Sequence, residues 1–323
     1  MKKRKLILPL IILLFVLFFG ASGWWNSNFS PVSSDESVKS FIIAKGQFVD
    51  EIVENLKKEN LIKSPFFFKW HLKQSGLDSK LQEGTFKLSP SQSSKEIAET
   101  LTKAPNDAWI TLLEGWRVEE MAEVLNGKLK IDNGEFIKQG KKYEGYLFPD
   151  TYLFPKEITV DGVIKVLRAN FEKKYTEDLR KKIRAKGLTD DEGVILASIV
   201  EREGRSDKVR TEIAGILLKR LSIDMGLNVD AASQYALGFQ KSEKSWWKRH
   251  LTSEDKKIES PYNTYKYRGL PPTPIANPSI SSLEAVANAD PKTPYLYYYH
   301  DSKGNSYYAK ILEEHNENVA NNP

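Results

Sequence analysis

An uncharged apolar stretch near the N-terminus constrains this chain more than any other feature of its sequence. The stretch reads LILPLIILLFVLFFGASG over residues 6–23, after the basic residues MKKRK and before Trp24 and Trp25. A run of about 18 such residues can cross the hydrocarbon core of a bilayer as a helix. Lysine and arginine stay on the cytoplasmic side of a membrane, and tryptophan favours the interface. The sequence therefore predicts a single-pass anchor in the lipid bilayer over residues 1–25, with a cytoplasmic N-terminus and the remaining chain outside the cytoplasm.

A secretory signal peptide is the competing interpretation of the same stretch. Ala21, Ser22 and Gly23 are small residues that would form a poor cleavage site, and the apolar stretch is long for a signal peptide. Both interpretations place the chain after Trp25 outside the cytoplasm, which narrows the choice of substrates.

The composition excludes several classes of function. Cysteine is absent, which excludes a disulfide framework, a thiolate zinc site, a cysteine nucleophile and a lipid-modified cysteine. The formal net charge is +5, and the cations of MKKRK account for most of it, so no basic face remains for nucleic acid. The histidines lack metal-ligand spacing, so we predict no metal site; they are His71, His250, His300 and His315.

The sequence after the anchor divides into three parts. Residues 26–40 are polar, rich in serine and without periodicity, which predicts a linker. Residues 41–104 combine a short apolar strand, two helices and a returning strand at TFKL, and Ser64 is the expected N-cap of the second helix. A boundary near KAPN leaves residues 105–323 as a larger domain.

The larger domain alternates helices with short strands rich in aromatic residues. Apolar periodicity and capping residues predict helices over residues 161–186 and 190–203, and a third from an N-cap at Ser206 to Leu221. The stretch YLYYYHDSKGNSYYAKI predicts a β-hairpin, which a last short helix follows. Since no regular βαβ alternation occurs, the predicted fold class is α+β with mainly antiparallel strands.

The helix over residues 190–203 ends in a candidate catalytic carboxylate. The stretch VILASIVEREG places Glu201 on the face that carries Val194, Ala197 and Ser198. A carboxyl beside such an apolar stripe is desolvated, so its pKa is expected to rise toward neutrality, as in the general acid of a glycosidase. The alternative is a surface glutamate paired with a neighbouring arginine, and the spacing alone favours that alternative.

Two stretches have the composition of the walls of a sugar-binding groove. The stretch SWWKRH holds Trp246 and Trp247 beside cations. The stretch SPYNTYKYRGLPPTPIANP holds Tyr262, Asn263 and Tyr265 ahead of prolines that stiffen the backbone. Aromatic rings stack on the C–H faces of sugars while amides bind the hydroxyls, but such rings can equally belong to the core.

Five motifs occur in order along the chain. They are EGYLFPDTYLF (144–154), LASIVEREG (196–204), GLNVDAASQYALG (226–238), SPYNTYKYRGLPPTPIANP (260–278) and TPYLYYYHD…EEHN (293–316). Together they resemble the MltG/YceG family of endolytic murein transglycosylases. The resemblance covers essentially the whole chain, including the N-terminal apolar stretch.

The resemblance implies functional residues at the matching positions. Glu201 is implied as the catalytic carboxylate. The family's YNTY and D-x-x-x-Q-Y segments, with the aromatic stretches above, give the predicted substrate-binding residues: Asn263, Tyr262, Tyr265, Asp230, Gln234, Tyr235, Trp246 and Trp247. Two positions depart from the family pattern. This chain has Thr273 where the family usually has glycine, and Ser306 where the family often has a histidine.

The resemblance also implies an activity. The expected reaction cleaves the bond between N-acetylmuramic acid (MurNAc) and N-acetylglucosamine (GlcNAc) in nascent peptidoglycan strands, with one glutamate as acid and then base. The products carry 1,6-anhydroMurNAc ends, and no cofactor is needed. Residues 41–104 are similar to a LysM-like subdomain, either a glycan clamp or a spacer, and peptidoglycan synthases (penicillin-binding proteins) are implied partners. The alternative function is a non-catalytic, membrane-tethered scaffold that binds peptidoglycan.

Overall fold

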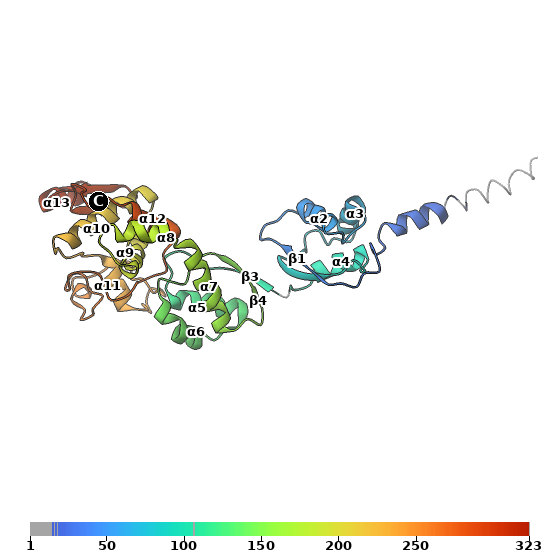
Figure 1. Ribbon diagram of the computed structural model, residues 1–323, viewed down its shortest axis with the longest axis horizontal. Helices are drawn as coiled ribbons and strands as arrows, with labels where there is room; N and C mark the ends of the chain where they lie inside the picture. Colours follow the sequence, from blue (N-terminus) through green and yellow to red (C-terminus); the bar gives the residue numbers. More distant parts are fainter. Residues whose placement is uncertain (1–14, 16, 18, 106, 323) are drawn as a thin grey trace, which may run out of the picture. The chain divides into compact units, whose positions relative to one another are not determined.

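The chain divides into two compact units. The computed structural model describes residues 15, 17, 19–105 and 107–322 (Figure 1). The first unit is Met1–Trp109 with Leu153–Lys156, and the second is Ile110–Tyr152 with Glu157–Pro323. The unit boundaries fall within β3 (Asp107–Thr111) and β4 (Thr151–Pro155), which form a two-stranded sheet.

The predicted membrane anchor lies largely outside the described residues. Residues 19–27 are helical. Within the part of the chain that the structure describes, no helix is both long and apolar enough to cross a membrane.

The first unit is a small α+β module around one antiparallel strand pair. Strand β1 (Lys39–Ile43) pairs with β2 (Gly84–Leu88), as the sequence predicts, with Phe41 opposite Phe86. Side chains alternate between the two faces of a strand, and those on one face enter an apolar core with the helices. These helices are α2 (Val49–Lys58), α3 (Pro65–Gln74) and α4 (Ser94–Leu101).

The segment predicted to be a linker, residues 26–40, contacts the first unit along much of its length. Phe29 is only 5% exposed, and its carbonyl accepts a hydrogen bond from Ser94 N over 2.9 Å. Ser89 Oγ donates to the carbonyl of Asp35 over 2.9 Å. These contacts fix the segment on the module, although its polar composition alone predicts a free linker.

The second unit is mainly helical and ends in a hairpin. Strands β5 (Tyr297–His300) and β6 (Ser306–Ala309) pair antiparallel, which confirms the predicted hairpin. Antiparallel pairing in both units agrees with the predicted α+β class. The helices are α5 (Val118–Leu129), α6 (Asn133–Gly140), α7 (Val160–Lys174), α8 (Glu177–Arg184), α9 (Asp190–Glu203), α10 (Asp207–Ser222), α11 (Asp230–Leu237), α12 (Ile280–Asn288) and α13 (Leu312–Asn321), with short 3-10 turns at Lys141–Tyr143 and Asp255–Lys257.

Helix α9 is the centre of this unit. It starts at a capping box, in which Thr189 Oγ1 accepts from Glu192 N and the Glu192 carboxylate accepts from Thr189 N. Residues 193–200 are all buried, because helices α8, α10, α11 and α12 surround it. The helix ends at Gly204. The apolar stretch therefore builds the core, and its last turn carries two glutamates.

The single helix predicted over residues 161–186 is two helices. The chain leaves helix α7 at Tyr175, and Thr176 caps helix α8 by accepting a hydrogen bond from Leu179 N. The apolar periodicity continues across this break, so periodicity alone does not reveal the turn. The threonine at position 176 is a local signal for a new helix start, because threonine is a common N-cap residue. The N-cap predicted at Ser206 is confirmed, since its Oγ accepts from Val209 N.

Candidate functional site

A polar cavity of about 430 Å³ lies in the second unit, where helix ends meet the C-terminal hairpin. Helix α9 contributes its last residue, Glu203, and helix α11 contributes its first, Asp230. Strand β5 supplies a wall of tyrosines. The lining residues are Glu203, Arg220, Asn228, Asp230, Tyr265, Tyr297, Tyr298, Tyr299, His300, Leu312 and His315.

Glu203 is a carboxyl with the proton affinity of a general acid. Desolvation by the surrounding protein raises the pKa of Glu203 to about 7. A hydrogen bond of 3.2 Å from Tyr298 Oη to Glu203 Oε2 opposes this rise, and the nearby charge of Asp230 adds to it. Glu203 nevertheless keeps some exposed surface and lines the cavity. The side chain therefore carries its proton in a substantial fraction of molecules at neutral pH and remains open to a ligand.

Asp230 is the second carboxyl of the cavity and has cationic support. Tyr265 Oη donates a hydrogen bond of 2.5 Å to Asp230 Oδ1. Lys256 Nζ lies 3.2 Å from the same oxygen and 2.9 Å from Tyr265 Oη. The cavity therefore holds two carboxyl groups, of which Asp230 contacts an ammonium group and a phenol hydroxyl.

Arg220 holds one side of the cavity in place. Its guanidinium donates to the carbonyls of Leu296 over 2.7 Å and Leu227 over 2.6 Å. The first carbonyl precedes strand β5 and the second precedes helix α11, so one side chain fixes both lining segments. Burial lowers the pKa of Arg220, while carbonyl oxygens accept from its Nε and Nη1.

Glu201 lies in a different environment from the one that the sequence predicts. Its side chain is 5% exposed, and Arg210 donates to Oε1 over 3.0 Å. Oε2 accepts from Ser279 N over 2.8 Å, from Ser279 Oγ over 2.5 Å and from Ser282 Oγ over 2.8 Å, at the N-terminus of helix α12. Glu114 lies near Glu201. Burial raises the pKa of Glu114, and the negative charge of Glu201 raises it further. Through these contacts Glu201 joins helices α9, α10 and α12.

Periodicity alone does not separate the two glutamates. Glu201 follows Ala197 and Ser198 on one face of helix α9, but Glu203 follows Ile199 and Val200 on another in the same way. All of these positions are buried, so the helix has no single apolar face from which to choose. Glu203 is therefore a functional candidate that the sequence prediction missed. Glu203 is distinguished by its position beside the tyrosines of strand β5, which lie far along the chain from it.

The predicted tryptophan wall is stacked with arginines of the protein itself. The Arg202 guanidinium lies 3.9 Å from the centre of the Trp247 ring. The Arg117 guanidinium lies 4.1 Å from the Tyr235 ring and 5.1 Å from the Trp246 ring. Both indole N–H groups donate to glutamates of helix α5. These rings are therefore partnered within the second unit.

The remaining predicted substrate-binding residues also have partners within the protein. Asn263 is 0% exposed, and its Nδ2 donates to two backbone carbonyls over 2.9 Å each. Gln234 Nε2 donates to the carbonyl of Lys248 over 2.6 Å. Tyr262 Oη lies 2.6 Å from Thr273 Oγ1, so the residue that departs from the family pattern contacts a motif residue. Of the predicted set, Asp230 and Tyr265 line the Glu203 cavity.

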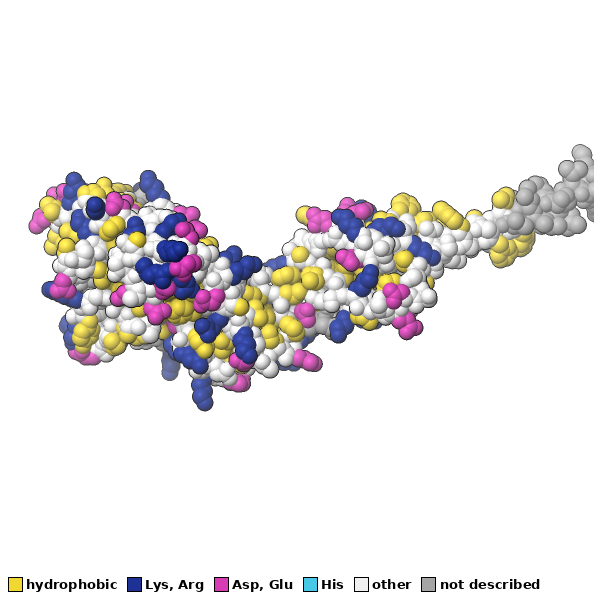
Figure 2. All heavy atoms as spheres, in the orientation of Figure 1, with side chains coloured by type: hydrophobic (Ala, Val, Ile, Leu, Met, Phe, Trp, Pro, Cys, Tyr) yellow, Lys and Arg dark blue, Asp and Glu magenta, His cyan; other side chains and the backbone are white. Residues whose placement is uncertain are grey.

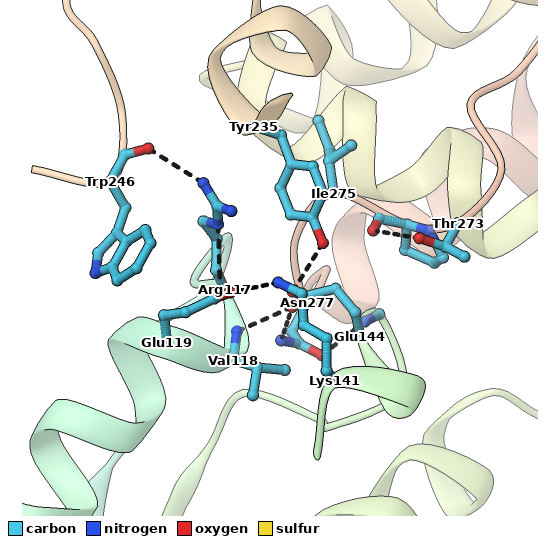
Figure 3. A network of polar contacts seen from close by, with 12 residues as sticks. Arg117, Val118, Glu119, Lys141, Glu144, Tyr235, Trp246, Thr273, Ile275 and Asn277 are labelled. Carbon is cyan, nitrogen blue, oxygen red and sulfur yellow. Dashed lines mark hydrogen bonds and ion pairs between the residues drawn. The ribbon is translucent and has the colours of Figure 1, made fainter. Parts of the chain in front are cut away.

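A second buried carboxyl, Glu144, organises the loops of this unit (Figure 3). Glu144 Oε1 accepts from Val118 N over 3.0 Å and from Asn277 Nδ2 over 3.1 Å, while Oε2 accepts from Lys141 Nζ over 3.0 Å and from Tyr235 Oη over 3.3 Å. Burial raises the pKa of Glu144 to about 7. Since Glu144 is only 3% exposed, this carboxyl has no access to substrate, and we assign it a structural role.

The described residues do not contain a cluster of three or more histidine, aspartate or glutamate side chains that could hold a metal ion. On the face drawn in Figure 2, basic and acidic side chains are interspersed on both units. The candidate site is therefore characterised by its two carboxyls and its tyrosines.

Comparison with known proteins shows the family of the chain. The profile of the YceG-like family matches residues 41–321. The chain is 32% identical to the endolytic murein transglycosylase of Bacillus subtilis strain 168, over 92% of this chain and 88% of the relative. It is 30% identical to the endolytic murein transglycosylase of Streptococcus pneumoniae D39, over 95% of this chain and 64% of the relative, so it spans less than two thirds of that protein. A crystal structure of a YceG-like protein from Listeria monocytogenes is 27% identical, with a TM-score of 0.59, and covers 87% of this chain and 98% of the Listeria chain.

Proposed function

Because the chain belongs to the YceG-like family, we propose that it is a lytic transglycosylase that cuts peptidoglycan strands outside the cytoplasm. The relatives from B. subtilis and S. pneumoniae are named endolytic murein transglycosylases. One observation in this chain carries the proposal. Glu203 has a pKa of about 7 and lines a cavity of about 430 Å³.

The proposed reaction uses Glu203 first as an acid and then as a base. Protonated Glu203 gives its proton to the glycosidic oxygen as the bond between C1 of MurNAc and that oxygen breaks, and GlcNAc leaves with a hydroxyl. The C6 hydroxyl oxygen of the same MurNAc then attacks C1, while its proton passes to the Glu203 carboxylate. The 1,6-anhydro ring closes, Glu203 is protonated again, and no water is consumed.

One acid–base carboxyl is sufficient for this reaction. Hydrolytic glycosidases use two, because one protonates the leaving oxygen and the other activates water or attacks the sugar. Here the nucleophile is part of the substrate, so its effective concentration replaces the second group. A single acid–base carboxyl needs a pKa near the pH at which the enzyme works, and burial raises the pKa of Glu203 toward that value.

Glu201 remains the competing acid, because the family resemblance of the sequence points to it. We propose Glu203 as the acid in preference to Glu201, because Glu201 already accepts hydrogen bonds from Arg210, Ser279 and Ser282. These donors, with the ion pair to Arg210, tie the Glu201 side chain to helices α10 and α12. Its surroundings therefore support a structural role better than proton transfer.

The products of digestion test the proposed function. Purified protein incubated with isolated sacculi is expected to release fragments with 1,6-anhydroMurNAc ends, because the C6 hydroxyl replaces water as nucleophile. Mass spectrometry distinguishes these ends from the reducing ends made by a hydrolase. Reducing ends would contradict the transglycosylase chemistry. Binding to sacculi without new ends would favour the non-catalytic scaffold.

We also propose that residues 1–25 anchor the chain in the cell membrane with the second unit outside the cytoplasm. The apolar stretch, the preceding cations and the following tryptophans support this topology. The full chain is then expected to stay in the membrane fraction after a high-salt wash, and a reporter fused after Pro323 is expected to be active only outside the cytoplasm. Release of a chain that begins near Trp24 would instead identify a cleaved signal peptide.

The first unit is proposed as a LysM-like module. Its order of strand, two helices and strand supports this, as does a cavity of about 350 Å³ lined in part by Phe48, Asp50 and Lys69. Phe48 is 76% exposed, which suits stacking on a sugar ring. A glycan clamp is therefore favoured over a spacer. Peptidoglycan synthases are proposed partners on the family resemblance alone.

A further inference from the structure

Aromatic side chains gather where the proposed membrane anchor meets the first unit. Trp24 and Trp25 lie near the end of the helical residues 19–27. Both pack edge-on against Phe67 of helix α3, with ring centres 5.5 and 4.9 Å apart. The Trp25 ring also lies 5.1 Å from the ring of Trp70, and the Phe66 ring lies 5.3 Å from that of Phe67. We call Trp24, Trp25, Phe66 and Trp70, which surround Phe67, the aromatic surface.

The aromatic surface is open on its outer side. Phe67 is buried, but the four rings around it are exposed, and Phe66 is 68% exposed. Phe66 and Trp70 are four residues apart, so they lie on one face of helix α3, while Phe68 and Leu72 of the same helix enter the core of the unit. Exposed apolar side chains that gather in one place mark a contact surface.

The position of the aromatic surface is fixed relative to the end of the anchor. Lys63 Nζ donates to the carbonyl of Ser27 over 3.3 Å and to Ser30 Oγ over 2.6 Å. The buried Phe29 ring lies 5.7 Å from the Phe67 ring. These contacts join the residues directly after the anchor to helix α3 without a free linker. On the proposed topology, the aromatic surface therefore lies where the hydrocarbon core of the bilayer ends.

The charges around the aromatic surface are complementary to the phosphate groups of lipids. Helix α3 contains Lys69 and Lys73 and no aspartate or glutamate. Lys69 pairs with Asp50, which offsets its charge, whereas Lys73 is exposed. The oxygens that Lys63 contacts are neutral, so they do not offset its charge. Tryptophan rings at headgroup level, with lysines that extend to the phosphates, are typical of a membrane interface.

We propose, resting on the topology above, that the aromatic surface docks on the outer leaflet of the cell membrane. Phe66 and Trp70 enter the headgroup region beside Trp24 and Trp25, and Lys73 contacts lipid phosphates. The bilayer is the occupant because the anchor brings it to the same place and because the surrounding lysines match its charge. A unit that is docked in this way does not swing freely on its anchor.

A spin label on a single cysteine tests the docking in the full chain, which has no cysteine of its own. The variant Phe66→Cys is labelled and reconstituted in vesicles that contain phosphatidylglycerol. Electron paramagnetic resonance then measures collisions of the label with oxygen, which concentrates in the bilayer, and with a nickel complex, which stays in water. We expect the ratio of oxygen access to nickel access at Phe66 to be several-fold higher than at a control position on the same unit.

Ile42→Cys is the matched control. Ile42 is an exposed apolar residue of strand β1. Its neighbours Phe41 and Ile43 enter the core, so the side chain of Ile42 points to the other face of the sheet. A label there is expected to collide mainly with the nickel complex. Equal melting temperatures of the two variants would show that both labels report on the same fold.

A third label separates failure of the docking from failure of the topology. Phe15 lies within the apolar stretch, so Phe15→Cys reports on the anchor itself. Oxygen access at Phe15 with nickel access at Phe66 would overturn the docking and leave the anchor in place. Nickel access at both positions would refute the topology on which the docking rests. A label at Phe66 that neither reagent reaches would show that protein covers the surface, which also overturns the proposal.

Tryptophan fluorescence gives a second measurement that needs no label. Brominated lipids quench indole rings that lie at the level of the bilayer. We expect the quenched part of the emission to fall in Trp70→Phe and to stay unchanged in Trp109→Phe. Trp109 belongs to the same unit, and its Nε1 donates to the carbonyl of Ile43 at the end of strand β1. Equal quenched emission in the two variants would contradict the docking of helix α3.

Discussion

The variant Glu203→Gln is expected to form 1,6-anhydroMurNAc ends about 10²–10⁴ times more slowly than the unaltered protein. Glutamine keeps the size and the hydrogen bond from Tyr298 Oη, but it has no proton to give to the glycosidic oxygen. The rate of appearance of anhydro ends from sacculi, followed by mass spectrometry, measures the effect. Stability should not fall, because burial already penalises the ionised form of this carboxyl.

Glu201→Gln is the matched control for this variant, since it makes the same change two residues away on the same helix. It weakens a buried ion pair with Arg210 and the contacts at the start of helix α12. We expect it to lower the free energy of unfolding by about 1–3 kcal/mol, with activity per folded molecule within roughly tenfold of the unaltered protein. The reverse pattern, in which Glu201→Gln abolishes cleavage and Glu203→Gln does not, would show that Glu201 is the catalytic acid, as the sequence predicts.

The variant Asn277→Ala is expected to lower the free energy of unfolding of the chain by about 3–5 kcal/mol. Asn277 is 0% exposed, and its Oδ1 accepts from Gly145 N over 2.9 Å and from Leu147 N over 3.0 Å. Its Nδ2 donates to the carbonyl of Trp116 over 3.0 Å and to Glu144 Oε1 over 3.1 Å. Alanine removes the partner of the N–H groups of Gly145 and Leu147 and one donor to each of the two acceptors. Each buried group that loses its partner lowers the free energy of unfolding by about 1–3 kcal/mol.

Urea unfolding followed by circular dichroism measures this loss. Asn170→Ala is the control, because Asn170 is partly exposed and its amide donates to Asp150 and Tyr152. Water can replace those contacts, so the expected loss there is below about 1 kcal/mol. Similar losses in the two variants would show that the Asn277 network does not hold the loops together.

Local signals in the sequence were sufficient for many elements of the second unit. Helix α9 has a capping box at Thr189 and a glycine at its end, and Ser206 caps helix α10. The hairpin has a turn sequence between two runs of tyrosine. Each of these signals lies within a few residues of the structure that it predicts, so neighbouring residues decide the outcome.

The site depends on contacts between distant residues, and there the sequence prediction was incomplete. The choice between Glu201 and Glu203 rests on which one meets Tyr298 and which one meets Ser279. Both partners come from segments far along the chain. Composition alone could not show that Asn263 faces the backbone and not solvent.

The wall of the cavity beside Glu203 has a consequence for the order in which the protein becomes active. Tyr298 and His315 follow Glu203 far along the chain, yet they line the same cavity. On the proposed topology, the residues after the anchor leave the cytoplasm in chain order, so Glu203 is exposed before the hairpin has emerged. During that interval the carboxyl lacks its tyrosine wall and remains hydrated, with the proton affinity of an ordinary glutamate. On the proposed function, an emerging chain lacks its acid, and the ability to cut peptidoglycan is acquired only when the C-terminal hairpin completes the fold.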